Sequence, residues 1–212
     1  MKSKYFSEFL GTAFLFCTVV GSGIMGENLS SNDSLTLLAN TLATVFALYF
    51  LITIFGDHSS HFNPVVSMVM LVRKEISTQV CTVFIILQIS GAILGVMLAN
   101  YIFELDPVLF SEKPRSGTHL FVSEILATFG LLMVILLSAK EKVAVTVAAY
   151  IGAAYWFTSS TSFANPAGTI GRSFSNTFAG ISTNDILHFC MAQIIGAFLA
   201  LITYRIFFES QK

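Results

Sequence analysis

His-Phe-Asn-Pro-Val at residues 61–65 recurs as Phe-Ala-Asn-Pro-Ala at residues 163–167, each time beside a strongly apolar stretch. Asparagine is a preferred residue just before the first turn of a helix. Proline suits that first turn because its missing N–H would have no intrahelical partner there. Each motif therefore predicts the start of a short helix that carries an amide side chain at its tip. Two such tips, placed alike in two halves of an apolar chain, indicate a membrane pore built from an inverted repeat.

The composition indicates an integral membrane protein. The 212 residues are 55% hydrophobic and 11% charged, with a mean hydropathy of +0.78, which is more apolar than soluble domains of this length. A transmembrane helix needs about 20 apolar residues. Because the chain lacks the alternation of barrel strands, we predict an all-α membrane protein with six transmembrane helices. These spans are expected at about 5–25, 36–55, 78–103, 118–139, 143–161 and 186–208.

Further landmarks repeat in the same order as the two motifs. One repeated segment begins with a glutamate inside an apolar stretch, and the other begins with a glutamine. In each case the two copies lie somewhat more than 100 residues apart. The repeat divides the chain into halves of about 1–112 and 113–212, within a single domain. The repeated segments are Glu-Phe-Leu-Gly-Thr (8–12) with Glu-Ile-Leu-Ala-Thr (124–128), and Gln-Ile-Ser-Gly-Ala (88–92) with Gln-Ile-Ile-Gly-Ala (193–197).

Three spans in each half require the second half to insert upside down relative to the first, so the two Asn-Pro loops enter from opposite faces. The apolar stretches after the motifs, 65–72 and 167–179, are too short to cross a bilayer. We interpret each as a re-entrant half-helix, which is tolerated at membrane depth where protein or a water-filled cavity surrounds it.

The positive residues predict the orientation, because cytoplasmic loops carry an excess of Lys and Arg. With six spans and both termini on one side, only Lys113, Arg115 and Arg172 fall on the opposite side. We therefore expect a multi-pass protein of the inner (plasma) membrane with both termini cytoplasmic, surrounded by the lipid bilayer. The net charge of −1 gives no reason to expect a nucleic-acid partner. The residues on the cytoplasmic side are Lys2, Lys4, Arg73, Lys74, Lys140, Lys142, Arg205 and Lys212.

Asn63 and Asn165 are the first candidate pore residues. Each would offer an amide N–H to a passing solute, while the carbonyls of the preceding loop accept hydrogen bonds. Each half-helix start also carries a partial positive charge of about half a unit, and two such ends at the midplane would repel cations. His61 either lines the cytoplasmic vestibule, where it would titrate near neutral pH as a gate, or fixes its loop by a hydrogen bond.

Glu8 and Glu124 are acids inside predicted spans, where an ionisable residue is by default a functional candidate such as a proton relay. Their symmetric placement and the lack of a basic partner within the spans favour another role, namely accepting hydrogen bonds from the N–H groups of the re-entrant loops. Gln88 and Gln193 have the same loop-bracing interpretation, with pore lining as the alternative.

Other function classes find little support in the residues. An enzyme would need a metal cluster, a nucleophile with its base or a glycine-rich nucleotide loop, and the sequence offers none with the right spacing. We therefore expect no catalytic residue, no metal and no cofactor. A secondary carrier with inverted repeats is the alternative to a passive channel. It would need an ion or proton site, for which Glu8 and Glu124 are the only deep acids.

These features together resemble the aquaporin family, also called the major intrinsic protein family, over essentially the whole chain. The resemblance rests on the six spans, the paired motifs, the matching acids and glutamines, and His61 two positions before the first Asn. It implies a passive channel for water or small neutral solutes such as glycerol-like polyols. It also implies a homotetramer with one pore in each subunit.

The chain departs from the family pattern after the second motif, where the usual arginine is replaced by Gly168. Ungapped counting back from Asn165 places two further constriction positions at Ser162 and Ala153. Counting back from Asn63, with allowance for a loop one residue shorter than usual, places the remaining one at Thr44, with Ala43 as the alternative. Such a constriction has no bulky aromatic side chain and no fixed cation. We therefore expect a wide, weakly polar filter, in which Gly168→Arg would depress the transport of bulky solutes more than that of water.

Arg172 lies one helical turn beyond Gly168, which leaves two interpretations. It either reaches back to the outer vestibule and partly restores the missing cation, or it snorkels at the extracellular surface. The run from Asn165 to Phe174 is similar to a bacterial aquaporin-like subgroup often linked to arsenic-resistance operons. This similarity adds uncharged metalloid acids to the candidate solutes.

Overall fold

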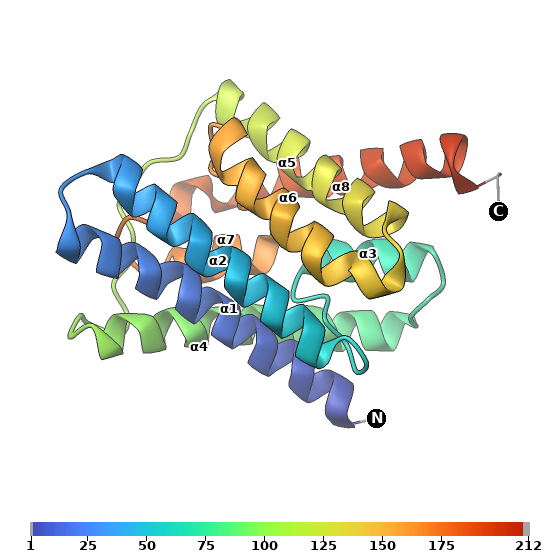
Figure 1. Cartoon of the computed structure of the whole chain (residues 1–212), viewed down its shortest axis with the longest axis horizontal. Helices are drawn as coiled ribbons and strands as arrows, with labels where there is room; N and C mark the ends of the chain where they lie inside the picture. The colour runs from blue at the N-terminus through green and yellow to red at the C-terminus, as the bar shows by residue number, and fades with distance from the viewer. Residues whose placement is uncertain (1, 210–212) are drawn as a thin grey trace.

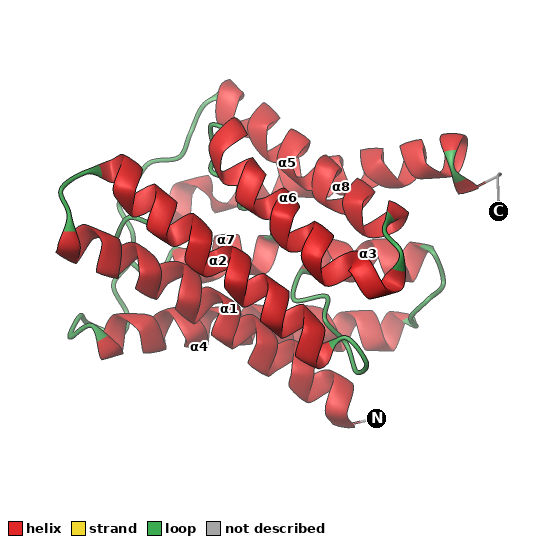
Figure 2. Cartoon of the chain, in the orientation of Figure 1, coloured by secondary structure: helices red, strands yellow, loops and turns green. Residues whose placement is uncertain are grey.

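The computed structural model describes residues 2–209, and every regular element within this range is helical (Figure 2). The all-α prediction is therefore confirmed for the described residues, while Lys212 of the orientation argument lies outside them. Five helices are long and apolar enough to cross a membrane. They are α1 (Lys2–Leu29), α2 (Asp33–Phe55), α4 (Thr78–Ile102), α5 (Thr118–Leu137) and α8 (Ile186–Phe207), the last preceded by the turn η2 (Thr183–Asp185).

The fifth predicted span, at about 143–161, is shorter than expected. Helix α6 (Val143–Phe157) has 15 residues and follows the short turn η1 (Lys140–Lys142). A helix of this length rises only about 22 Å, less than the hydrocarbon core of a bilayer. It ends because a polar run at 158–162 follows, in which Ser and Thr side chains compete for backbone hydrogen bonds. The predicted end at residue 161 is therefore wrong, and this run forms the loop leading to the second motif.

Two half-helices begin at the Asn-Pro motifs, as predicted. Helix α3 (Pro64–Val72) has nine residues and α7 (Pro166–Arg172) has seven, each with proline in its first turn. The Asn63 Oδ1 accepts a hydrogen bond from the Val65 N–H at 3.1 Å, and the Asn165 Oδ1 accepts one from the Ala167 N–H at 3.0 Å. The asparagines thus satisfy N–H groups that have no partner within the helix.

The two halves use the same packing arrangement (Figure 1): α1 packs against α4 and α2, and α5 packs against α8 and α6. Glycines allow the closest of these contacts. A Cβ atom on Gly95 of α4 would lie 2.1 Å from the Ala13 carbonyl oxygen of α1, and one on Gly196 of α8 would lie 2.4 Å from the Ile125 carbonyl oxygen of α5. Small residues at helix crossings are typical of membrane proteins. The division of the repeat between residues 112 and 113 stays a prediction.

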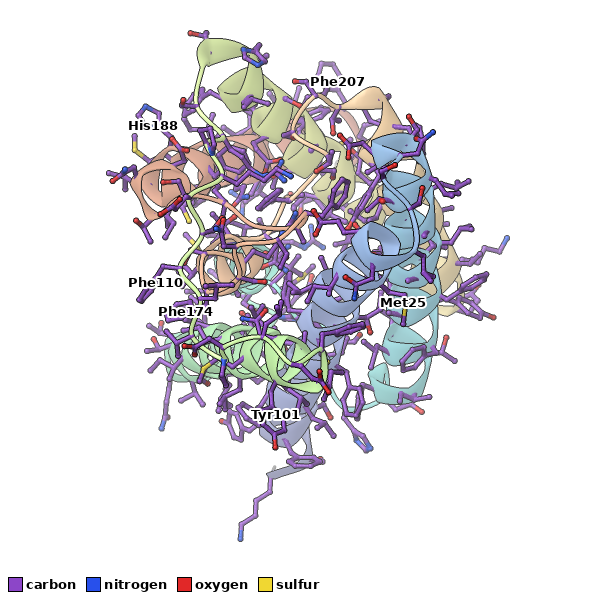
Figure 3. All side chains as sticks on the ribbon, turned by 90° about the vertical axis from the view of Figure 1, so that its left-hand side faces the viewer. Met25, Tyr101, Phe110, Phe174, His188 and Phe207 are labelled. Atoms are coloured by element: carbon purple, nitrogen blue, oxygen red, sulfur yellow. The ribbon has the colours of Figure 1, made fainter. Side chains whose placement is uncertain are left out.

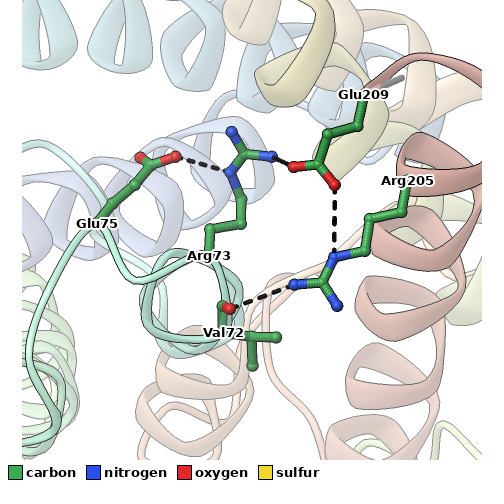
Figure 4. A network of polar contacts seen from close by, with 5 residues as sticks. All are labelled: Val72, Arg73, Glu75, Arg205 and Glu209. Atoms are coloured by element: carbon green, nitrogen blue, oxygen red, sulfur yellow. Dashed lines mark hydrogen bonds and ion pairs between the residues drawn. The ribbon is translucent and has the colours of Figure 1, made fainter.

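The start of α1 and the end of α8 lie toward the same end of the bundle, at the right of Figure 1. A polar network joins the end of α8 to the end of α3 (Figure 4). Arg73 contacts Glu75 at 2.7 Å and Glu209 at 3.4 Å, Arg205 contacts Glu209 at 3.7 Å, and Arg205 also donates to the Val72 carbonyl at 3.3 Å. This network fastens the C-terminal end of one half-helix to the bundle.

We expect Glu209→Gln to weaken this network with only a small effect on stability. The Glu209 side chain is 47% exposed, and exposed ion pairs contribute about 0–1 kcal/mol each. Thermal unfolding in detergent should therefore show a shift of at most a few degrees, which shrinks further at high salt because screening weakens the wild-type contacts. A large shift that is insensitive to salt would contradict this expectation.

Candidate functional site

A cavity of about 160 Å³ lies between the tips of the two half-helices. Its wall combines residues of α1, α2, α3, α5, α6 and α7 with the loops that carry the two motifs. Most of the lining is apolar, as in ligand sites where a few polar groups orient the ligand. The polar side chains on the wall are Thr44, Ser60, His61, Asn63, Tyr155, Ser162, Asn165 and Arg172.

The two asparagines are linked reciprocally across the cavity. The Asn63 Nδ2 donates to the Ala164 carbonyl and the Asn165 Nδ2 donates to the Phe62 carbonyl, both at 2.8 Å. Phe62 and Ala164 adopt left-handed backbone angles, with φ of 49° and 46°, which costs conformational energy and aims these carbonyls at the opposite motif. Because an amide NH₂ has two hydrogens, each asparagine keeps one N–H for a molecule in the cavity.

The acids of the repeat lie behind the two loops. Both carboxylates are fully buried. Glu8 accepts hydrogen bonds from the N–H groups of His61 and Phe62, each at 2.8 Å, and Glu124 accepts from those of Phe163 and Ala164, each at 2.9 Å. Each carboxylate thus holds two consecutive backbone N–H groups of a loop that has no regular secondary structure, as the bracing interpretation requires.

Each glutamine donates a hydrogen bond to the acid of its own half. The Gln88 Nε2 donates to Glu8 at 2.7 Å and to the Ser67 Oγ at 3.0 Å. The Gln193 Nε2 donates to Glu124 at 2.7 Å and to the Thr169 Oγ1 at 2.9 Å. Both glutamines are fully buried and neither lies on the cavity wall. The alternative of pore lining therefore does not match their placement.

His61 lines the cavity and also has a hydrogen-bond partner that fixes its loop, while its role as a gate stays a prediction. Its ring lies on the cavity wall. Its Nδ1 is also within 3.0 Å of the Ser67 Oγ, and the ring packs edge-on against Phe84 with centroids 5.5 Å apart. The histidine is therefore held in place by its neighbours while it faces the cavity.

Two of the four counted constriction positions are not on the cavity wall. Ala153 is exposed on the outside of α6, because it lies two residues, or about 200°, from both Ile151 and Tyr155, which face the cavity. Gly168 is buried behind Phe16, and a Cβ atom there would lie 2.2 Å from the Phe16 Cζ. Thr44 and Ser162, the other two positions, do line the cavity.

The cavity wall contains aromatic rings and a cation that the four counted positions do not include, and the composition of the constriction itself stays a prediction. Phe16, Tyr155 and Phe163 all line the cavity, and the Tyr155 hydroxyl is 3.1 Å from the Thr44 Oγ1. Arg172 is only 4% exposed, so it does not snorkel at the surface. Its Nε donates to the Ala179 carbonyl at 2.5 Å, and its guanidinium lies 3.3 Å from the centroid of the Phe163 ring.

A bundle of membrane-length apolar helices, with two capped half-helices meeting at an internal cavity, defines a channel-type membrane protein. Residues 1–160 match the model of the major intrinsic protein family, so the chain belongs to this family. It is therefore a membrane channel protein of the kind that passes small neutral solutes, and not an enzyme.

Relatives and a solved structure agree with this assignment. The chain is 46% identical over 203 residues to aquaglyceroporin AqpS of Rhizobium meliloti, covering 94% of this chain and 87% of that protein. It is 31% identical to glycerol uptake facilitator protein-like 6 of Lactiplantibacillus plantarum, covering 96% of this chain and 97% of that protein. The fold matches the aquaglyceroporin of Plasmodium falciparum with a TM-score of 0.74 at 17% identity, over 99% of this chain and 98% of that one.

Proposed function

We propose that this channel conducts glycerol-like polyols and water by passive diffusion, and uncharged metalloid acids of similar size. The reciprocal pair of Asn63 and Asn165 carries this proposal, since it presents two N–H donors within a largely apolar cavity. Glycerol and the trihydroxy metalloid acids both offer several hydroxyl oxygens to such donors. The relatives named as an aquaglyceroporin and a glycerol uptake facilitator support glycerol as the first solute to test.

The remaining wall residues fit a solute with one polar and one apolar side. The Ser162 Oγ is buried and has no hydrogen-bond partner among the described residues, so it is free to bind a solute hydroxyl. Thr44, Tyr155 and Arg172 surround the same part of the cavity, while Leu48 lies among its apolar lining. Hydroxyl groups would bind the first set as the carbon chain faces the apolar wall. In this proposal Glu8, Glu124 and the two glutamines keep the loops in shape.

The same proposal includes the orientation and assembly of the protein. The start of α1 and the end of α8 share one end of the bundle, where Arg73 and Arg205 also lie, which supports a cytoplasmic position for that end in the plasma membrane. The large apolar side chains on the outside of the bundle, such as Phe46 at 65% exposure, fit contact with lipid or with neighbouring subunits of a homotetramer.

Stopped-flow light scattering on proteoliposomes tests the function directly. Vesicles with the purified protein should take up glycerol and arsenous acid far faster than empty vesicles, without any ion or proton gradient. The rate should rise linearly with the solute gradient, as in a channel. A saturating rate that depends on an ionophore-sensitive gradient would instead identify a secondary carrier, and water flow without glycerol flow would restrict the proposal to water.

Tyr155→Ala tests which face of α6 forms the filter. Removing the ring should open the cavity and raise the ratio of erythritol to glycerol uptake several-fold. Ala153→Leu is the matched control, because it adds bulk to the opposite face of the same helix and should leave both rates unchanged. If Ala153→Leu slows uptake and Tyr155→Ala has no effect, then Ala153, and not Tyr155, lies at the constriction.

A further inference from the structure

Three cationic side chains gather at one mouth of the cavity. Lys113 and Arg115 belong to the loop between α4 and α5, and Arg172 ends α7. They donate to three consecutive carbonyls of one loop: Lys113 Nζ to Phe178 at 2.8 Å, Arg172 Nε to Ala179 at 2.5 Å and Arg115 Nε to Gly180 at 2.7 Å. Figure 3 looks onto this end of the bundle, where Phe110 and Phe174 mark the edge. We call these three residues the basic cluster.

The basic cluster is not neutralised by ion pairs in the part of the chain that the structure describes. The ion pairs found in residues 2–209 involve only Arg73 and Arg205, in the network at the opposite end of the bundle. The neighbouring carboxylates are engaged with backbone groups instead. Glu27 accepts from the Phe178 N–H at 2.9 Å, and Asp185 accepts from the Arg115 N–H at 2.7 Å. The three cations are therefore not paired directly with a carboxylate, while Glu27 and Asp185 keep their negative charges nearby.

Arg115 stays charged at neutral pH although its surroundings lower its pKa. Burial lowers the pKa of Arg115 to about 10, and burial together with the nearby Arg115 lowers the pKa of Lys113. A base with a pKa of about 10 is protonated almost completely at pH 7, so Arg115 keeps its charge. The lowered pKa means that this charge is unfavourable because it is removed from water. An anion therefore stabilises such a buried cation more than it stabilises an exposed cation.

The two groups nearest the cavity have hydrogen-bonding capacity to spare. A guanidinium has five N–H donors, and the Nε of Arg172 is the only one with a partner among the described residues. Its Nη groups therefore remain for a ligand. Ser162, on the same wall, is only 3% exposed, and its Oγ is a buried atom that also lacks a partner there. Unpartnered buried polar atoms of this kind are rare and require an explanation.

We propose that the outer mouth holds a binding site for a small monovalent oxyanion, formed by Arg172 and Ser162 and supported by the charges of Arg115 and Lys113. The cavity beyond this site is largely apolar, so an ion would lose its hydration without compensation there. The anion therefore binds at the mouth without crossing. Because it occupies the wall that neutral solutes use, it competes with them.

Methanesulfonate is a suitable probe, because it is small, monovalent and permanently charged, and dimethyl sulfone is its uncharged counterpart of similar shape. We expect methanesulfonate to slow glycerol uptake by proteoliposomes in a saturable way, at constant ionic strength set with chloride. Dimethyl sulfone should not. Arg172→Gln should raise the half-inhibiting concentration about tenfold, as the loss of a charge-assisted hydrogen bond predicts. Lys113→Gln should raise it by a smaller factor, and Lys2→Gln, an exposed cation on another part of the bundle, should leave it unchanged.

Isothermal titration of methanesulfonate into the detergent-solubilised protein measures binding without any transport. A saturable heat that Arg172→Gln and Lys113→Gln weaken supports the site even if glycerol proves not to be a solute. The proposal is overturned if the wild type shows neither binding nor inhibition. It is also overturned if dimethyl sulfone inhibits equally, or if both basic-cluster variants bind as Lys2→Gln does. If Arg172→Gln does not fold, Lys113→Gln decides the outcome.

Discussion

Glu8→Ala is expected to reduce the yield of folded protein to a small fraction of the wild-type yield. The substitution leaves the N–H groups of His61 and Phe62, together with the Gln88 amide, without their acceptor in a fully buried place. Each unsatisfied buried group costs about 1–3 kcal/mol, and the missing side-chain volume adds to the loss. The total is comparable with the whole stability of an ordinary domain, about 5–15 kcal/mol. The yield of monodisperse protein and its thermal unfolding in detergent measure this loss.

Glu8→Gln is the matched control, because the structure offers a way to accommodate it. The Gln88 Oε1 is buried and has no partner among the described residues. Rotation of the Gln88 amide would turn this oxygen toward the new amide at position 8. The Phe62 N–H and the Gln88 Nε2 then lose their acceptors, but the acceptor of the His61 N–H and the side-chain volume remain. The unfolding temperature should therefore fall much less than in Glu8→Ala. Wild-type stability and glycerol uptake in Glu8→Ala would show that the loop does not need its brace.

The sequence predicted the fold well because the relevant signals are local. Apolar length identifies membrane helices, and Asn followed by Pro identifies the half-helix starts, since the capping bonds join residues two or three apart. The hydrogen bonds of Glu8 reach more than fifty residues along the chain, yet the repeat indicated them. The same acid recurs at Glu124, which also precedes its motif in the second half of the chain.

The filter was harder to predict because counting along a loop assumes the path of that loop. The segment between α6 and α7 includes Thr161, Ser162 and Ala164 in left-handed conformations, with φ of 61°, 49° and 46°. Tyr155, and not Ala153, shares the cavity wall with Ser162. The helical stripe formed by Val147, Ile151 and Tyr155 was a signal in the sequence that favoured this face.

Arg172 was ambiguous for a different reason. A long side chain one turn beyond a glycine can point outward or back along its helix, and spacing alone does not distinguish these directions. The contact with Phe163 and the Ala179 carbonyl decides the direction here, and both partners come from loop segments whose paths the sequence does not specify. Local signals therefore identified the half-helices, while the side chains between them depended on loop geometry.

Gly168→Arg is expected to block glycerol uptake by moving Phe16 and not by placing a guanidinium in an open filter. A Cβ atom at position 168 would lie 2.2 Å from the Phe16 Cζ, so any side chain there must displace the ring. The ring lies on the cavity wall, and displacement toward the cavity narrows the path. Glycerol uptake should fall by at least about tenfold, an increase of about 1.4 kcal/mol in the barrier, while water flow falls less. Stopped-flow measurements of both solutes in one preparation give this comparison.

Gly168→Ala and Phe16→Ala separate steric displacement from the effect of charge. Gly168→Ala adds only the Cβ atom, so it should already reduce glycerol uptake, and the double variant Phe16→Ala/Gly168→Ala should recover it because the ring is gone. Two residues in contact should show such non-additive effects. Equal loss in the single and double variants would mean that Gly168 acts through the backbone of α7 instead. Wild-type uptake in Gly168→Ala would show that Phe16 yields without narrowing the cavity, and the block by Gly168→Arg would then have to arise from its charge.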